Sequence, residues 1–229
     1  MKALWTAILL FGATARAGET TWDLNSSNEV DFSPADAEVT GGAARLYDRT
    51  WGDASDGNLS VGGTFTLSSS TSNGRTQPDG YTTNLSGNVG AGAGAITVAA
   101  SAGYAVGDEI LIISTKGDTV GRYEIRRITA KSGNTLTLER ALTNAYEHGS
   151  GEDRTQVIRV PNYGTVTVSG RITTAAWNGN TGGVVVFRAR SLTNTGNIDT
   201  NAAGYRLGRA NGCSAGYGYR GESYNGGLT

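Results

Sequence analysis

The chain has 229 residues, of which 35 are glycine, 3 are proline and only 17% are charged. This length is enough for one large or two small domains. Short alternating patches of Val, Ile, Leu and Tyr exclude a disordered chain, and the absence of a strict glycine period of three excludes collagen. We therefore predict an all-β chain with many tight turns.

The first 17 residues, MKALWTAILLFGATARA, have the three parts of a secretory signal peptide. Lys2 precedes an apolar core at 3–13, and Ala15-Arg16-Ala17 matches the small-residue pattern of a cleavage site. The apolar core is too short to span a membrane as a helix. We expect export, to the outer face of a bacterial cell or beyond it.

The charge of the mature chain argues against nucleic acid and against an anionic membrane as partners. Without Lys2 and Arg16 the chain has 17 basic and 20 acidic side chains, which is a net charge of about −3. Cys213 is the single cysteine, so no internal disulfide supports the fold.

In chain order, we predict one or two strands or a linker at 18–50, with a turn at Gly41-Gly42. An antiparallel, barrel-like domain is predicted at 51–160. Its clearest strands are in VGDEILIIST and TLTLERAL, and the loop SGN at 132–134 suits a hairpin. This spacing is typical of a small antiparallel barrel or curled sheet from about 90 to 160.

One strand of that region, GRYEIRRITA at 121–130, changes phase. Tyr123 and Ile125 share one face, whereas Ile128 has moved to the other. A β-bulge would restore the inward face, and Arg126 and Arg127 would then both lean into solvent. The alternative is a functional basic site, but two arginines alone define no pocket.

Beyond Pro161 the pattern becomes that of a repeat. TVTVSGRITT at 165–174 aligns with SLTNTGNIDT at 191–200 at an offset of 26, and the strand-like run GGVVVFRA lies between them. Short strands at a fixed period predict stacked coils of a β-helix or β-solenoid at 161–207. A glycine-rich irregular tail is predicted at 208–229. Because stacked coils need a cap, we expect the chain to be the front portion of a longer protein.

A string of phrases resembles a known group of proteins. The phrases GDASDGNLSV, VGDEILIIST, VGRYEIRRITAKSGNTLTLERAL, TQVIRVPNYGTVTVSG, WNGNTGGVVVFRA and LTNTGNIDTNAAGYRLG occur in this order. They resemble the N-terminal region of large secreted bacterial surface proteins of the adventurous-gliding-motility type, over roughly 51–227. The resemblance implies a barrel-like segment that leads into a β-helical segment and a glycine-rich insertion. The chain departs from it at GYRLGRANG, where the family tends to have a Gly-Gly pair after the arginine.

The residue types that usually carry catalysis or bind metals are scattered. His148, the only histidine, lies in the polar loop YEHGSGEDR without a nucleophile motif. Cys213 has no second thiol nearby in the sequence. Asp53 and Asp56, in DASDGN, are weak metal candidates, because a calcium loop needs acids at alternate positions and these are three apart. Asp56-Gly57 is explained equally well by a turn.

The acids also form no obvious pair for cleaving a sugar chain. Glycosidases need two carboxyl groups that flank the bond. Glu152 and Asp153 are adjacent in a loop, and Asp199 is alone in the second predicted coil. We therefore predict no catalytic residues and no cofactor.

Aromatic rings could instead bind sugars by stacking on them. The candidates are Trp177, Tyr205, Tyr217, Tyr219 and Tyr224. The alternative is that Trp177 packs at a corner and the tyrosines hold glycine loops in place. Our functional hypothesis is a non-enzymatic secreted or cell-surface structural protein, the N-terminal part of a larger adhesin or gliding-associated protein, with polysaccharide as a possible partner. The alternative is a carbohydrate-binding or carbohydrate-active β-helical module, such as a polysaccharide lyase or glycoside hydrolase.

Overall fold

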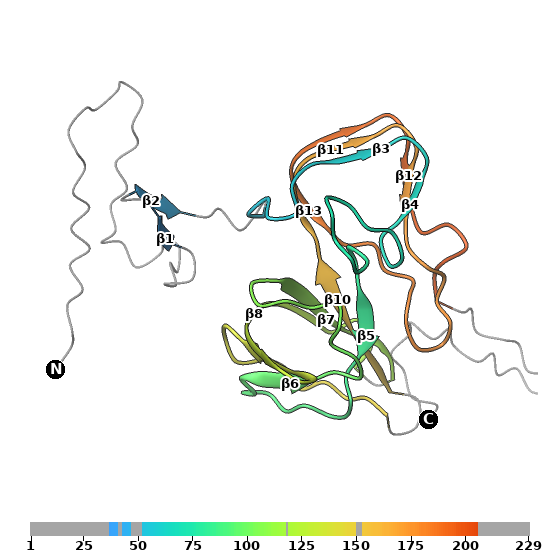
Figure 1. Ribbon diagram of the computed structural model, residues 1–229. Helices are drawn as coiled ribbons and strands as arrows, with labels where there is room; N and C mark the ends of the chain where they lie inside the picture. The colour runs from blue at the N-terminus through green and yellow to red at the C-terminus, as the bar shows by residue number, and fades with distance from the viewer. Residues whose placement is uncertain (1–36, 41–42, 47–51, 118, 150–152, 206–229) are drawn as a thin grey trace, which may run out of the picture.

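The computed structural model describes residues 37–40, 43–46, 52–117, 119–149 and 153–205. Within these ranges the chain forms strands β1 to β14 and no helix, which confirms the all-β prediction (Figure 1). The described part of the chain therefore contains no helix with the length and apolarity that a membrane crossing needs. The signal peptide predicted at 1–17 and the tail predicted at 208–229 lie outside the described residues. Strands β1 (Ala37–Thr40) and β2 (Ala43–Leu46) pair with each other as an antiparallel hairpin.

The largest sheet has six antiparallel strands and curls on itself. Its order is β5-β10-β7-β8-β9-β6. The strands are β5 (Thr82–Asn84), β6 (Ala95–Thr97), β7 (Glu109–Lys116), β8 (Tyr123–Ser132), β9 (Thr135–Leu138) and β10 (Arg154–Val160). Leu85 and Val98, which follow β5 and β6, form an antiparallel bridge that brings the two outer strands together. The predicted curled, barrel-like sheet is thus confirmed.

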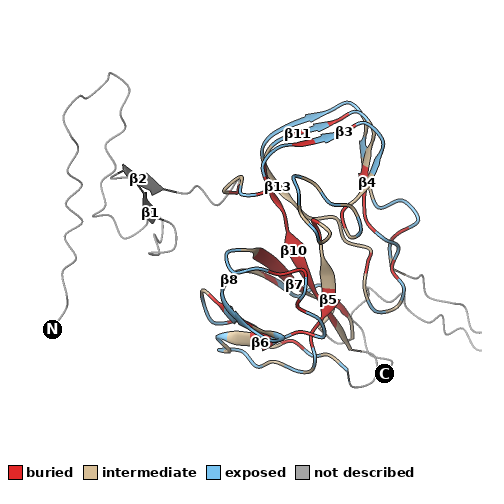
Figure 2. Cartoon of the chain, viewed as in Figure 1, coloured by how far each residue is buried: buried red, intermediate tan, exposed pale blue. Residues whose placement is uncertain are grey.

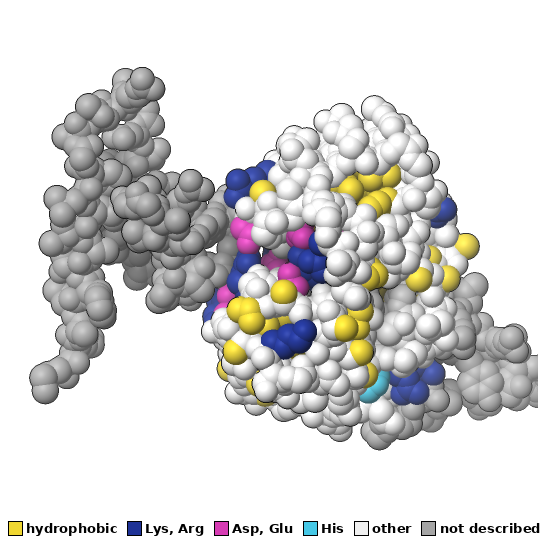
Figure 3. Space-filling model, viewed as in Figure 1, with side chains coloured by type: hydrophobic (Ala, Val, Ile, Leu, Met, Phe, Trp, Pro, Cys, Tyr) yellow, Lys and Arg dark blue, Asp and Glu magenta, His cyan; other side chains and the backbone are white. Residues whose placement is uncertain are grey.

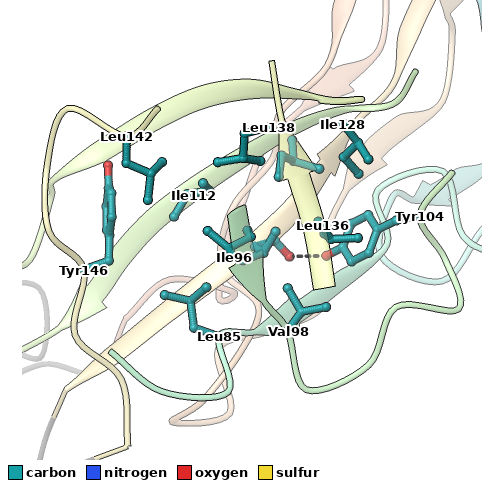
Figure 4. Close-up of a cluster of buried hydrophobic side chains, with 12 residues drawn as sticks. Leu85, Ile96, Val98, Tyr104, Ile112, Ile128, Leu136, Leu138, Leu142 and Tyr146 are labelled. Carbon is teal, nitrogen blue, oxygen red and sulfur yellow. Dashed lines mark hydrogen bonds between the residues drawn. The ribbon is translucent and has the colours of Figure 1, made fainter. Parts of the chain in front are cut away.

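The concave side of this sheet encloses an apolar core. Figure 4 shows aliphatic side chains from β6, β7, β8 and β9 pointing toward one another, with Tyr104 and Tyr146 at the two ends. The Tyr104 hydroxyl donates a hydrogen bond to the Val157 carbonyl at 2.7 Å, so this buried polar group is satisfied. Figure 2 shows buried residues concentrated along β7 and β10, in the middle of the sheet.

The second part of the fold is a stack of three parallel coils. Each coil has two short strands: β3 (Leu59–Val61) with β4 (Thr64–Thr66), β11 (Asn162–Val168) with β12 (Arg171–Thr173), and β13 (Arg188–Asn194) with β14 (Asn197–Ile198). The sheets run in the orders β13-β11-β3 and β14-β12-β4. Val166 pairs with Leu192 and Ile172 with Ile198, which is the offset of 26 that the sequence repeat predicted. The β-solenoid is therefore confirmed.

The first coil comes before the curled sheet in the chain, which the repeat did not reveal. Val166 pairs in parallel with Leu59, and Ile172 pairs with Phe65, at a separation of 107 positions. The curled sheet is therefore inserted between the first and second coils. The segment 51–160, which we predicted as one barrel-like unit, contributes strands to both parts of the fold.

Glycines at the corner between the two strands of each coil allow the coils to stack closely. A Cβ atom added to Gly170 would lie 2.1 Å from the Gly63 carbonyl oxygen, and one added to Gly196 would lie 2.0 Å from the Gly170 carbonyl oxygen. Both distances are below van der Waals contact, so the close backbone approach requires glycine. Gly170 and Gly196 are also two of the matched positions in the sequence repeat.

Two segments connect the sheet to the coils. Strand β10 continues into β11 across the single residue Pro161, so one stretch of chain belongs to both parts. The run 184–187, predicted as part of a strong strand, lies outside the strands, and β13 begins only at Arg188. Val185 and Phe187 pack into the coil core, whereas Val184 and Val186 pack on the outer face of the curled sheet.

Strand β8 carries a bulge, but not where the phase change predicted it. The ladder with β7 is unbroken from Tyr123 to Arg127, and the register shifts between Ile128 and Ala130, in the pairing with β9. The phase change has a different cause. Ile125 packs against the apolar cluster on the outer face of the sheet, and Ile128 lies in the core on the inner face. Both faces of β8 are covered, so apolar residues occur in both phases.

Candidate functional site

Charged side chains gather at the junction between the coil stack and the curled sheet. Figure 3 shows acidic and basic groups side by side around a hollow on this face of the molecule. The hollow is a cleft of about 630 Å³. Its lining residues are Asp53, Ser55, Asp56, Gly57, Asn73, Arg75, Val106, Gly107, Asp108, Arg127 and Arg159. We call it the junction cleft.

Arg159 of β10 is the central cation of the junction. Its Nη2 donates to Asp56 Oδ1 at 2.7 Å, and its Nε donates to Asp108 Oδ1 at 2.8 Å. Its Nη1 donates to the Asp79 carbonyl at 3.1 Å. Burial opposes the charged form of Arg159, but the charges of Asp108 and Asp56 outweigh this effect. The net result is a raised pKa, so the guanidinium stays charged.

Asp56 lies just before the first coil and joins it to the start of β11 in the second coil. Its second carboxylate oxygen accepts a hydrogen bond from the Asn162 amide at 2.7 Å, at the start of β11. The turn at Asp56-Gly57 that the sequence predicted is present, because the Gly57 amide donates to the Ala54 carbonyl and Gly57 has φ of 71°.

Asp53 and Arg127 form a second pair across the junction. Arg127 Nη1 donates to Asp53 Oδ2 at 2.8 Å and to the Gly107 carbonyl at 2.7 Å. Partial burial opposes ionisation of Asp53, yet hydrogen bonds from Ser55 and the charge of Arg127 hold its pKa below the ordinary value. The prediction that Arg127 leans into solvent is therefore wrong.

Arg126, its neighbour, is also engaged, on the opposite side of β8. It forms an ion pair with Glu124 and donates to Thr143 Oγ1 at 3.2 Å. Its side chain is only 12% exposed, so the prediction of a solvated arginine pair fails for both residues.

Two further contacts join the third coil to the sheet, and the second coil to the segment between β4 and β5. Arg188 of β13 donates through Nε and Nη2 to the two oxygens of Glu109 in β7, at 2.7 and 2.9 Å. This bidentate bond raises the pKa of Arg188. Tyr163 of β11 donates its hydroxyl to Asp79 Oδ2 at 2.6 Å. Burial, and then the bond to Asp79, raise the pKa of Tyr163 well above its ordinary value.

Asp53, Asp56 and Glu109 are thus each occupied by an arginine from the other part of the fold, whereas Asp108 pairs with Arg159 within the curled-sheet part. Asp53 and Asp56, the weak metal candidates, each bind an arginine. No group of three or more His, Cys, Asp or Glu side chains within the described ranges is placed to hold a metal ion. The partners Asp56 and Arg159 are 103 positions apart, and no local pattern in the sequence signals such a pair.

The aromatic candidates lie elsewhere. Trp177 is only 6% exposed and packs edge-on against Tyr205, with ring centroids 5.0 Å apart, so its faces are covered by protein. Burial raises the pKa of Tyr205 to about 12. This geometry matches the alternative of a packed corner residue. Tyr217, Tyr219 and Tyr224 lie outside the described residues.

The remaining candidates are apart from the junction cleft. His148 accepts a hydrogen bond from the Thr155 amide at its Nδ1, at 3.1 Å. Asp199 forms a bidentate ion pair with Arg171, with Nη2 2.5 Å from Oδ1. Glu152 and Cys213 lie outside the described residues. Asp153 lies directly before β10.

No protein-family model and no curated protein matches the chain. Three solved structures of phage tailspikes are similar to parts of it. Tailspike gp49 of Pseudomonas phage LKA1 has 27% identity and a TM-score of 0.30, over 42% of this chain and 17% of that one. Gp54 of Acinetobacter baumannii bacteriophage AP22, solved with a capsular saccharide, has 15% identity and a TM-score of 0.31, over 52% and 22%. Gp61 of Pseudomonas phage phi297 has 19% identity and a TM-score of 0.31, over 58% and 23%. The chain spans less than a quarter of the length of each of these tailspikes.

Proposed function

We propose that this chain is a non-enzymatic structural module of an exported bacterial surface protein. In this module, β-solenoid coils form a rigid stack, and the inserted curled sheet is fixed to its side. The observation that carries the proposal is the set of ion pairs at the junction, which join the two parts of the fold. The sequence resemblance adds the finer proposal that the whole protein is an adhesin or a gliding-associated surface protein.

The state of the acids favours a structural role over catalysis. A glycosidase needs a carboxylic acid whose pKa is raised, so that it can protonate the leaving group, and a second carboxylate across the bond. The pKa of Asp53 is instead lowered. Asp56 uses both of its oxygens, for Arg159 and for the Asn162 amide. Breaking such a pair to act on a substrate would leave a buried charge, which is costly.

The outer edge of the third coil favours a place in a longer solenoid. One column of aliphatic side chains runs through equivalent positions of the three coils. Its exposed fraction is 5% at Leu59 in the first coil, 0% at Val166 in the second and 50% at Leu192 in the third. Strand β13 pairs with β11 on one side, and no other described strand pairs with it. A further coil of the same period would cover Leu192 and pair with this edge.

The proposal is tested by incubating the mature chain with a panel of bacterial and algal polysaccharides. We expect no new reducing ends, which report hydrolysis, and no ultraviolet absorbance from unsaturated products, which reports lyase action. Product formed by the purified mature chain, and absent after heat denaturation of the chain, would overturn the proposal in favour of an enzyme. Export is tested separately by sequencing the N-terminus of secreted protein, which we expect to begin at Gly18.

A further inference from the structure

We propose that the junction cleft binds an acidic saccharide, with Arg75 and Arg127 receiving the sugar carboxylate. This goes beyond the structural role, because that role needs no ligand. The cleft volume of about 630 Å³ is within the range of about 300–1,000 Å³ that is usual for small-molecule sites.

The accessible charge in the cleft is mainly positive. The side chains of Arg75 and Arg127 are each 23% exposed, whereas those of Asp53, Asp108 and Asp56 are 16%, 9% and 5% exposed. Within the described residues, Arg127 donates its hydrogen bonds through Nη1 alone. Arg75 donates through Nη2 to the Gly103 carbonyl at 3.3 Å, and its Nε, which is buried 3.7 Å from Asp79 Oδ1, faces away from any ligand, so Nη1 is the donor left. These two guanidiniums therefore have donor capacity left for an anionic group, and a guanidinium can bind a carboxylate with two parallel bonds.

The other lining groups favour a sugar over a simple anion. Asp53 and Asp108 are acceptors at the same cleft, and a compact anion would bring only further acceptors toward them. A sugar acid carries hydroxyl groups, which can donate to these carboxylates while its own carboxylate accepts from the arginines. Val106, which is 60% exposed, provides an apolar contact for the C–H face of a sugar ring.

The cleft is also held in shape before any ligand arrives. Ala54 has φ of 62°, in the left-handed region that residues other than Gly, Asn and Asp seldom adopt, whereas Asn73, with φ of 48°, is of a type that tolerates this region. The Asn73 side-chain amide donates to the backbone carbonyls of Asp56 and Asn58, at 2.5 and 2.9 Å, and so fixes one loop against the other. Such strain, supported by neighbouring contacts, is common where a binding surface is preorganised.

The test measures binding of trigalacturonate to the mature chain by calorimetry at low ionic strength, with its methyl ester as the uncharged match. We expect the acid to bind about tenfold or more tightly than the ester, because the ester lacks the charge-assisted bonds. Arg75→Gln should weaken binding of the acid about tenfold. Arg140→Gln, at a side chain 56% exposed and outside the cleft lining, should leave it unchanged.

A second pair of variants guards against loss of folding. Val106→Asp adds a negative charge at an exposed position of the cleft, and Val106→Asn has a similar shape without the charge. We expect Val106→Asp to bind the acid at least about threefold more weakly than Val106→Asn, with the difference shrinking in high salt. Two kinds of result overturn the proposal. One is a lack of selectivity: no binding at millimolar trigalacturonate, equal binding of the ester, or equal competition from acetate. The other is unchanged binding of the acid in Arg75→Gln and Val106→Asp. None of these results would bear on the polysaccharide cleavage assay, so the two proposals can fail independently.

Discussion

The guanidinium of Arg159 in the curled sheet lies 2.7 Å from the carboxylate of Asp56 in the loop that leads into the first coil. The two residues are 103 positions apart, and their side chains are only 4% and 5% exposed. The pair joins the inserted sheet to the coil stack at the point where the chain first enters the coils. Because both charges are buried, Asp56 depends on the guanidinium, which also pairs with Asp108 at 2.8 Å.

Close stacking of the coils makes Gly170 intolerant of a side chain. In Gly170→Ala the new methyl group would lie 2.1 Å from the Gly63 carbonyl, which belongs to the backbone of the neighbouring coil and cannot move alone. We expect a loss of about 2 kcal/mol or more in the free energy of unfolding. Gly87→Ala, where nothing lies within 4 Å, is the control and should change it by about 0.5 kcal/mol or less. Urea denaturation measures both, and equal effects would refute the stacking of these backbones.

The inward columns of the coil stack should differ in importance from coil to coil. Ile172 is 0% exposed in the second coil, whereas Leu192 is 50% exposed in the third. Ile172→Ala should therefore destabilise the chain by about 2–5 kcal/mol, since it leaves a cavity. Leu192→Ala should cost about 1 kcal/mol or less. A larger loss at Leu192 than at Ile172, in the same denaturation assay, would contradict the order of burial.

Acid should weaken the fold through Glu124. Burial opposes its ionisation, but the Thr143 and Asn144 amides donate to it at 2.9 and 2.6 Å, and the pKa is lowered from 4.5. A lowered folded-state pKa stabilises the fold above the unfolded value, and this stabilisation is lost as pH falls through the folded value. Glu124→Gln should thus be less stable than the wild type at pH 7, with a gap that narrows by pH 3. A gap that stays constant across this range would be inconsistent with the shift.

His148 offers a second pH test, because it is the only histidine. Burial, and then the charge of Arg154, lower its pKa from 6.5. The neutral imidazole, which accepts a bond from the Thr155 amide, is therefore favoured in the folded state. Its contribution to stability is present above pH 6.5 and is lost as pH falls through the lower folded value. Titration of the imidazole signals by NMR should give a midpoint below 6.5, and Arg154→Gln should raise it; a midpoint at or above 6.5 would disprove the shift.

The sequence predicted those parts of the fold that depend on neighbouring residues. Short alternating strands and the hairpin at 132–134 predicted the curled sheet, and the repeat at an offset of 26 predicted the register of the second and third coils. The first coil was missed because its partner is 107 positions away, and Leu59–Thr66 is too short to show a period by itself. The phase change in β8 was misread because a single strand does not show that both of its faces are covered.

The site was less predictable than the fold. Asp53 and Asp56 were weak metal candidates because DASDGN resembles a fragment of a calcium loop, but their arginine partners come from β8 and β10, which only the folded chain brings near. Nothing local marks Arg159 as buried, since arginine is usually exposed. Trp177 was a reasonable candidate by residue type, and only its packing against Tyr205 shows that its ring is covered.

The junction ion pairs hold the two parts of the fold together, and a double-mutant cycle on Asp56→Asn and Arg159→Met tests this most directly. We predict that Arg159→Met loses about 3–5 kcal/mol in the free energy of unfolding, because Asp56 and Asp108 then remain buried without their guanidinium. Asp56→Asn should lose less, because Asp108 still pairs with Arg159. The double variant should lose clearly less than the sum of the two, which gives a coupling energy of about 1.5 kcal/mol or more. Losses that simply add, with no coupling between the two sites, would contradict the claim that this pair holds the curled sheet on the coil stack.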